Sequence, residues 1–351
     1  MNEEIIKSER KAADLVPGMR IGVIGAGRIV RLFLSAVAQV EGAVCTAICT
    51  REKTMERATL LGKQHGIEQI YNDVDKFLSD GDFDWVYIGV ENALHYEYAK
   101  KALLCNKHVI VEKPICGIRS QVEDLYQLAK ERDRFMYEAM MVFYLPLYQT
   151  LKQCVERLVD IKVVMCNFSK VSSAYEAYCN GVVGHFFDKE SYGGALYDLN
   201  IYNINVLAGI FGMPADVRYF PNHGYNGVDT SGVAMLTYPE YQVCCVAAKD
   251  SDGVDFMQIQ ARNGYIYLEG ATASLSKLTV CVDGVVETYE AQDEHDVRMA
   301  CEVRAMKEMW AAGDLEACYA IMQDTLNAIE IIEKLHQSVE CQADCRGILE
   351  L

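Results

Sequence analysis

Residues 20–40 read RIGVIGAGRIVRLFLSAVAQV, and their pattern changes halfway along. The β-branched run at 20–25 predicts a buried strand, and apolar residues then recur at helical spacing as far as residue 40. Gly25 permits a tight turn between the strand and the helix. Gly27 lets a pyrophosphate approach the backbone at the start of the helix, which offers free N–H groups. The stretch therefore predicts a dinucleotide-binding turn, with an ordinary strand-to-helix turn as the alternative.

Strand and helix go on alternating to about residue 140. Strands are predicted at 20–25, 44–50, 85–90, 108–114 and 134–139 and near Tyr71, and helices at 28–40, 51–66, 73–80, 95–107 and 120–133. Parallel strands joined by crossover helices form a doubly wound sheet, so we expect an N-terminal Rossmann domain.

The pattern changes after about residue 150. Short β-rich runs follow one another, joined by Gly, Asn or Asp turns, which is typical of an antiparallel sheet. A helical segment interrupts them at 193–212, and two helices close the chain near 296–312 and 315–338. We therefore predict an α/β protein of three parts: a polar arm at 1–18, the Rossmann domain at 19–140, and an α/β domain with a large, mostly antiparallel sheet at 141–351.

Composition narrows the classes of function. A formal charge of −17 argues against nucleic acid as a partner, and no apolar run is long enough for a membrane span. The charged N-terminus lacks the apolar core of a signal peptide. The 14 cysteines are scattered, and Cys341 with Cys345 has no further thiol or imidazole to complete a metal site. We expect a cytoplasmic protein with reduced thiols and no metal.

The end of the second predicted strand bears on the choice of cofactor. NAD enzymes place an acid there for the ribose hydroxyl, whereas this chain has Thr50 and Arg51 followed by Glu52. A hydroxyl and a guanidinium suit the 2′-phosphate of NADP(H). NAD stays open, because Glu52 could face the ribose while Arg51 is merely solvated.

Two further motifs carry polar chemistry. Lys113 stands between Glu112 and Pro114 at the end of a buried strand, where ligands bind in this architecture. Asp198 and Tyr202 are four residues apart, so a helix would place both on one face. A solvated lysine and a packing tyrosine are the alternatives to a role in proton transfer.

These motifs together resemble the glucose-fructose oxidoreductase/inositol dehydrogenase (Gfo/Idh/MocA) family, whose pattern reads TPN..H…AL..GKHV..EKP and later GGAL.D.G.Y/H. The matching residues are 90–95 (VENALH), Ala102-Leu103, Lys107-His108-Val109, Glu112-Lys113-Pro114 and 193–202 (GGALYDLNIY). With the glycine turn, the resemblance runs from about residue 20 to 335. Tyrosine at 202 and the segment 138–146 (EAMMVFYLP) are similar to its dimeric dihydrodiol dehydrogenase and NADP-xylose dehydrogenase branch.

The resemblance implies roles for particular residues. Lys113 would be the catalytic lysine, Asp198 its substrate-side carboxylate, and Tyr202 the acid/base in the place of the family's histidine. The bond before Pro114 is often cis in the family, and the second domain often forms a dimer. The residues implied for cofactor binding are Gly25, Gly27, Arg28, Ile29, Thr50, Arg51, Asn92, His95, Glu112 and Lys113.

Three residues depart from the family pattern. Val30 replaces a small residue, so we expect helix and strand to pack slightly further apart. Glu91 replaces proline and places an acid near the cofactor, and Asn200 replaces glycine and adds polar bulk near the pocket. These departures leave the substrate undefined.

The resulting hypothesis is hydride transfer between NADP(H) and a carbinol carbon of a sugar, polyol or cyclic diol, by a homodimer or higher homo-oligomer. The alternatives are a regulator that senses NADP(H) without turnover and a reductase of a non-sugar carbonyl compound. Lys113 and Tyr202 count against the regulator, because sensing requires neither.

Overall fold

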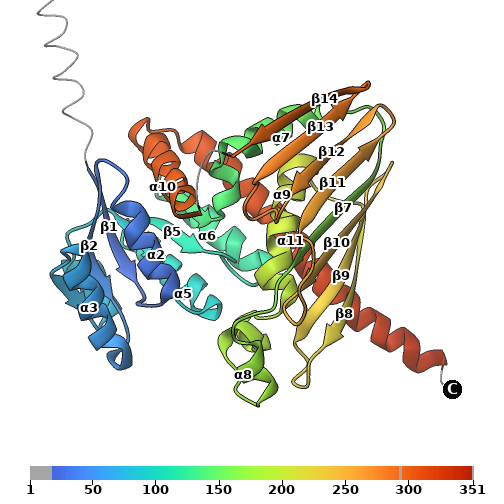
Figure 1. Cartoon of the computed structure of the whole chain (residues 1–351). Coiled ribbons are helices and arrows are strands. Elements are labelled where there is room, and N and C mark those ends of the chain that lie inside the picture. The colour runs from blue at the N-terminus through green and yellow to red at the C-terminus, as the bar shows by residue number, and fades with distance from the viewer. Residues whose placement is uncertain (1–17, 292–294, 350–351) are drawn as a thin grey trace, which may run out of the picture.

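The computed structural model describes residues 18–291 and 295–349, with side chains up to residue 339 outside the segment 292–297 (Figure 1). The expected polar arm lies outside this range except for Gly18, and so do the side chains of Cys341 and Cys345. Every cysteine whose side chain is described is a free thiol. No helix among the described residues is long and apolar enough to cross a membrane.

The first sheet has six parallel strands in the order β3-β2-β1-β4-β5-β6. Their bounds are β1 Met19–Ile24, β2 Ala43–Cys49, β3 Gln69–Tyr71, β4 Trp85–Ile88, β5 His108–Glu112 and β6 Met136–Ala139. The order reverses between β1 and β4, and ligands bind at such a switch point in open α/β sheets. The predicted doubly wound Rossmann sheet is confirmed.

Helices cover both faces of this sheet. They are α2 Arg28–Val37, α3 Met55–His65, α4 Val74–Asp80, α5 His95–Leu104 and α6 Arg119–Glu131, and α10 (His295–Ala311) returns to pack on α2. Val30 is fully buried in α2, and a Cβ placed on Gly89 would lie 2.9 Å from its Cγ2. The glycine after β4 therefore accommodates the bulk of Val30.

The second sheet has eight strands in the order β14-β13-β12-β11-β7-β10-β9-β8. Its strands are β7 Ile161–Ser169, β8 Asp216–His223, β9 Asp229–Thr237, β10 Gln242–Ala248, β11 Phe256–Ala261, β12 Gly264–Glu269, β13 Lys277–Val282 and β14 Val285–Glu290. Only β7 and β10 pair in parallel, and every other neighbouring pair is antiparallel. The predicted mostly antiparallel sheet is confirmed.

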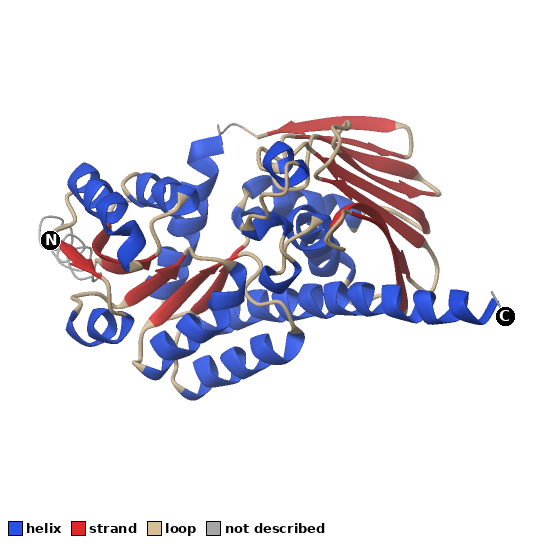
Figure 2. Cartoon of the chain, turned by 90° about the horizontal axis from the view of Figure 1, so that it is seen from below, coloured by secondary structure: helices blue, strands red, loops and turns tan. Residues whose placement is uncertain are grey.

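One face of the second sheet is covered and the other is open. Residues along β9 and β13 alternate between buried and half-exposed, because successive side chains point to opposite faces. Two helices, α9 (Ile201–Phe211) and α11 (Leu315–Leu349), lie on the covered face (Figures 1 and 2). Because α11 also packs against β6 and α6, it joins the two sheets into one structure.

Two short helices complete the second part of the chain. α7 (Pro146–Val155) follows the Rossmann sheet, and α8 (Tyr175–Cys179) projects from the segment between β7 and α9. That segment then runs through short 3-10 turns at His185–Phe187 and Lys189–Ser191 before it reaches residue 193. We call residues 184–192 the cleft loop; it contacts the turn after β4 through Asn92 and the end of β10 through Lys249.

Candidate functional site

The glycine turn after β1 has the geometry of an anion site. Gly25 has φ +124°, and a Cβ there would lie 2.3 Å from the carbonyl oxygen of Gly89, so only glycine fits. Gly27 precedes α2, and no heavy atom lies within 4 Å of where its Cβ would be. Among the described residues no side chain caps α2 and no acid stands in its first turn, which leaves its N–H groups open to a phosphate.

Arg51 and Glu91 meet across this turn. The Arg51 guanidinium donates from Nη2 to Oε1 of Glu91 over 2.8 Å, and the guanidinium lowers the pKa of Glu91 against a smaller effect of burial. Thr50 is buried, and its hydroxyl lies 2.7 Å from that of Thr54. Glu52 accepts a hydrogen bond from Asn72 instead. Of Arg51 and Glu52, Arg51 is thus the residue that reaches the turn after β4.

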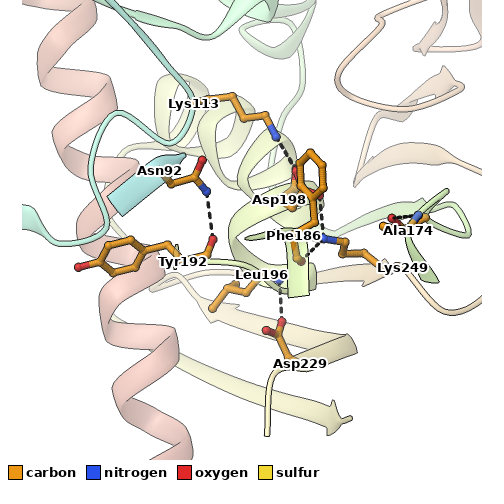
Figure 3. A network of polar contacts seen from close by, with 10 residues as sticks. Asn92, Lys113, Ala174, Phe186, Tyr192, Leu196, Asp198, Asp229 and Lys249 are labelled. Atoms are coloured by element: carbon orange, nitrogen blue, oxygen red, sulfur yellow. Dashed lines mark hydrogen bonds and ion pairs between the residues drawn. The ribbon is translucent and has the colours of Figure 1, made fainter. Parts of the chain in front are cut away.

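Lys113, Asp198 and Tyr202 come together at the carboxyl end of β5. The Lys113–Pro114 bond is cis, as the resemblance implied. Lys113 Nζ donates to Oδ1 of Asp198 over 2.8 Å and to its main-chain oxygen over 2.9 Å (Figure 3). The same Nζ lies 4.9 Å from the centre of the Tyr202 ring. Two distant segments of the sequence, one with Lys113 and one with Asp198 and Tyr202, therefore form one cluster.

The turn that carries Asp198 differs from the regular helix that the sequence predicted. Leu196–Asn200 form a π-helical turn that leads into α9, and such turns are frequent at functional sites. Two glycines before this turn allow the backbone to pass close to neighbouring atoms. A Cβ on Gly194 would lie 1.9 Å from Oδ1 of Asp229, and one on Gly193 would lie 2.6 Å from the main-chain oxygen of His185. Asp229 in turn accepts a hydrogen bond from the amide of Leu196 over 2.7 Å.

Lys249, which the sequence analysis missed, is a second lysine on Asp198. It follows β10, and its Nζ lies 2.8 Å from Oδ2 of Asp198. The same Nζ donates to the main-chain oxygen of Phe186 over 2.6 Å (Figure 3). No motif marks this lysine, because its importance depends on where the end of β10 meets the π turn. The Asp198 carboxylate thus has a lysine on each oxygen.

Attraction between the lysine ammonium groups and the Asp198 carboxylate determines the protonation states in this cluster. Burial opposes the charge on Lys113, but Asp198 outweighs it and raises the pKa of the ammonium above its usual range. Burial likewise opposes the charge on Asp198, and the two lysines lower the pKa of its carboxyl well below the ordinary value. Burial raises the pKa of Tyr202, while Lys113 opposes that change. At neutral pH the cluster holds a lysine ammonium, a carboxylate and a neutral phenol.

The other expected site residues lie around this cluster. Asn92 donates from its side chain to the Tyr192 oxygen over 3.2 Å and so links the turn after β4 to the cleft loop. His95 is buried, with its ring nitrogens 2.8 Å from the Pro114 oxygen and 3.2 Å from the Val90 oxygen. Burial lowers the pKa of His95 to about 4, so it is neutral. Glu112 turns into the Rossmann core, where it accepts from the Tyr87 hydroxyl over 2.6 Å.

The expectation for Asn200 was wrong. Its side chain is fully buried, accepts a hydrogen bond from Asn203 over 2.9 Å and donates to the Cys245 oxygen over 3.4 Å. Because the side chain faces the second sheet, it adds no polar bulk to the pocket. The four-residue spacing from Asp198 to Tyr202 still brings both residues to Lys113, although the first of them stands in a π turn.

The residues at the switch point fit a nicotinamide dinucleotide. The open amides at the start of α2 suit a pyrophosphate, the Arg51 guanidinium lies at the end of β2, and the lysine cluster lies at the end of β5. Arg28 and Ile29 are exposed and half-exposed at the helix start beside the turn. No group of three or more metal-ligating side chains occurs among the described residues.

Known proteins match this chain in sequence and in fold. Residues 19–139 match the model of an oxidoreductase family with an NAD-binding Rossmann fold, and residues 148–264 match the GFO/IDH/MocA C-terminal domain. Scyllo-inositol 2-dehydrogenase (NADP(+)) IolU of Bacillus subtilis is 30% identical over 72% of this chain and 76% of its own length. The trans-1,2-dihydrobenzene-1,2-diol dehydrogenase of Sus scrofa is 25% identical over 63% of this chain and 65% of its own length.

Solved structures agree on the fold. Levoglucosan dehydrogenase, in complex with NADH and L-sorbose, has a TM-score of 0.78 at 18% identity, and the match covers 91% of this chain and 97% of that one. A 3-ketoreductase from Actinomadura kijaniata, in complex with NADP, has a TM-score of 0.74 at 21% identity with the same coverage. The two family models together span more than half of the sequence. The chain therefore belongs to the GFO/IDH/MocA family of oxidoreductases and is an enzyme with a nicotinamide dinucleotide cofactor.

Proposed function

We propose that this enzyme transfers hydride between NADP(H) and a carbinol carbon of a sugar, a polyol or a cyclic diol. The observation that carries the proposal is the cluster at the end of β5. There Lys113 Nζ lies 2.8 Å from Asp198 and 4.9 Å from the centre of the Tyr202 ring. An ammonium and a phenol side by side can bind a substrate oxygen and exchange its proton.

The proposed cofactor site lies at the carboxyl ends of the strands of the first sheet. The turn of Gly25 and Gly27, with Arg28 and Ile29 behind it, would hold the pyrophosphate, and Thr50 with Arg51 would hold the 2′-phosphate. Asn92 would lie at the nicotinamide end, whereas the buried His95 and Glu112 would support the ends of β4 and β5 from behind. When bound, the nicotinamide supplies or accepts the hydride.

The chain's own residues would manage the proton and the orientation of the substrate. Tyr202 gives its hydroxyl proton to the substrate oxygen during reduction and takes it back during oxidation. Lys113 donates a hydrogen bond to the same oxygen and stabilises negative charge on it. Asp198 holds Lys113 through two hydrogen bonds, which fixes the direction of the ammonium.

The relatives support this substrate class and this cofactor. The relative from Bacillus subtilis is named as an NADP(+) enzyme that acts on scyllo-inositol, and the relative from Sus scrofa as one that acts on a cyclic diol. Arg51, whose exposed side chain pairs with Glu91 at the end of β2, is the residue of this chain that would read the extra phosphate.

We further propose that the open face of the second sheet forms a homodimer. Met165, Val233, Cys244, Val246 and Phe256 surround a shallow depression on that face. They are half-exposed, whereas their neighbours along each strand are buried against α9 and α11. A second copy of the chain would bury them.

A substrate screen tests the proposed activity. Purified protein is incubated with NADPH and ketoses, inososes and cyclic ketones, or with NADP+ and the matching alcohols, and the absorbance of the reduced nicotinamide is followed. Lys113→Ala serves as the matched control, because it keeps the glycine turn and Arg51. Turnover that Lys113→Ala lacks supports the proposal. Tight NADPH binding without turnover of any compound would favour the sensing regulator.

A further inference from the structure

Lys249 is more deeply buried than either of the other two charged residues in the cluster, Lys113 and Asp198. Its side chain is 1% exposed, compared with 16% for Lys113 and 22% for Asp198. An ammonium without partners in such a place would cost several kcal/mol. The fold offsets part of this cost with the Asp198 carboxylate, the Phe186 carbonyl and the face of the Phe187 ring, whose centre is 4.5 Å from Nζ. Burial still lowers the pKa of the ammonium below its ordinary value. Specific contacts on several sides therefore hold the buried ammonium in one position.

The two contacts of Lys249 join it to two different segments of the chain. Asp198 belongs to the π turn and orients Lys113, whereas Phe186 belongs to the cleft loop. That loop is also held from the Rossmann side, by the hydrogen bond from Asn92 to Tyr192. Its member His185 lies near enough to Glu91 and Asp198 for both charges to act on its pKa, which burial lowers. The loop thus has contacts with both the Rossmann sheet and the residues beside the π turn.

We propose that Lys249 is a positioning residue that couples the cleft loop to the carboxylate of Asp198. One ammonium holds the Asp198 oxygen that Lys113 leaves free and the Phe186 carbonyl at the same time, over 2.8 and 2.6 Å. A substrate that orders the loop therefore also fixes the carboxylate that directs Lys113. This inference rests on the proposed function for its kinetic consequence, but the coupling itself is a property of the chain.

Charge neutralisation by Lys249 has a consequence for pH dependence. Four titratable groups face Asp198: Lys113 just after β5, Lys249 just after β10, Tyr202 of α9 and His185 of the cleft loop. Asp229 of β9 acts on Lys249. Loss of the Lys249 charge removes one of the two lysines that keep the carboxyl ionised. The pKa of Asp198 then rises, and activity that needs the carboxylate is lost at a higher pH.

The test compares Lys249→Met with Lys249→Arg and with Thr272→Val. Thr272→Val is the structural control, because it removes a buried hydrogen bond from the Thr272 hydroxyl to Asn203 that joins neither Asp198 nor Phe186. Hydrogen exchange of residues 184–192 needs no substrate, and we expect it to accelerate about tenfold or more in Lys249→Met and to stay unchanged in Thr272→Val. Lys249→Arg, which keeps the charge, should restore much of the protection.

Kinetics give the second readout once a substrate is available. Lys249→Met should lower kcat by roughly tenfold or more and move the acid limb of the kcat/KM profile to higher pH, with an unchanged Kd for NADPH. Unchanged exchange in 184–192, or an unchanged acid limb, would overturn the coupling. If Lys249→Met does not fold, the hydrogen exchange of residues 184–192 and the pH profile are measured on Lys249→Gln, and the same outcomes apply. Exchange that accelerates in a protein without turnover would leave the coupling intact and count against the proposed function alone.

Discussion

Arg51 and Glu91 form an ion pair that joins the end of β2 to the turn after β4, with 2.8 Å between Nη2 and Oε1. Because β1 lies between β2 and β4 in the sheet, the pair spans the strand that carries the glycine turn. The residue that would read the 2′-phosphate is therefore held by an acid that the family pattern lacks.

Arg51→Ala should weaken NADP(H) much more than NAD(H). A charged contact to a phosphate is worth about 1.5–3 kcal/mol, which is roughly ten- to a hundredfold in Kd. Fluorescence titration with both reduced cofactors measures the change. Arg57→Ala is the matched control, because this exposed arginine stands further along α3. Equal losses for both cofactors would show that Arg51 does not read the phosphate.

Glu91→Ala should strengthen NADP(H) binding, because it frees the Arg51 guanidinium for the phosphate. The side chains are 51% and 39% exposed, and such pairs are worth about 0.2–1 kcal/mol, so the gain should be at most about fivefold. The double variant Arg51→Ala/Glu91→Ala should bind no better than Arg51→Ala alone. Weaker NADP(H) binding by Glu91→Ala would mean that the pair helps to form the site.

The pH dependence should differ between the two directions of the reaction. Burial raises the pKa of Tyr202 and Lys113 only partly opposes it, so the phenol keeps its proton at neutral pH. Reduction needs the protonated phenol and should stay level from about pH 6 to 9, whereas oxidation needs the phenolate and should accelerate as pH rises. Profiles of kcat/KM for one alcohol–carbonyl pair measure both. Oxidation that slows with rising pH over this range would contradict the assignment.

The open face of the second sheet predicts that the protein is a homodimer. Light scattering at micromolar concentration should give about twice the chain mass of 39.4 kDa. Val233→Asp, which places a charge on the half-exposed face of β9, should shift the protein toward monomer, and Glu240→Lys outside the depression should not. A monomer for the unaltered chain would refute the proposed dimer.

Sequence patterns predicted the elements that short-range physics determines. The glycine turn and the alternation of strand and helix specified the Rossmann sheet, and the four-residue spacing brought Asp198 and Tyr202 to Lys113. The missed features depend on contacts between distant segments. No sequence pattern distinguishes Lys249 from other residues that follow a strand. Asn200 was expected to face the pocket, but in the π turn its side chain is directed toward the second sheet.

The catalytic pair provides the most direct test of the account. Tyr202→Phe should lower kcat by about 10²–10⁴-fold, because it removes the proton donor and leaves the ring beside Lys113 in place. Lys113→Ala should cost at least as much, and the double variant should be little worse than the worse single one, because the two residues act as a unit. The Kd for NADPH should change little in Tyr202→Phe. Turnover by Tyr202→Phe near that of the unaltered enzyme would contradict the mechanism and assign the proton to another group.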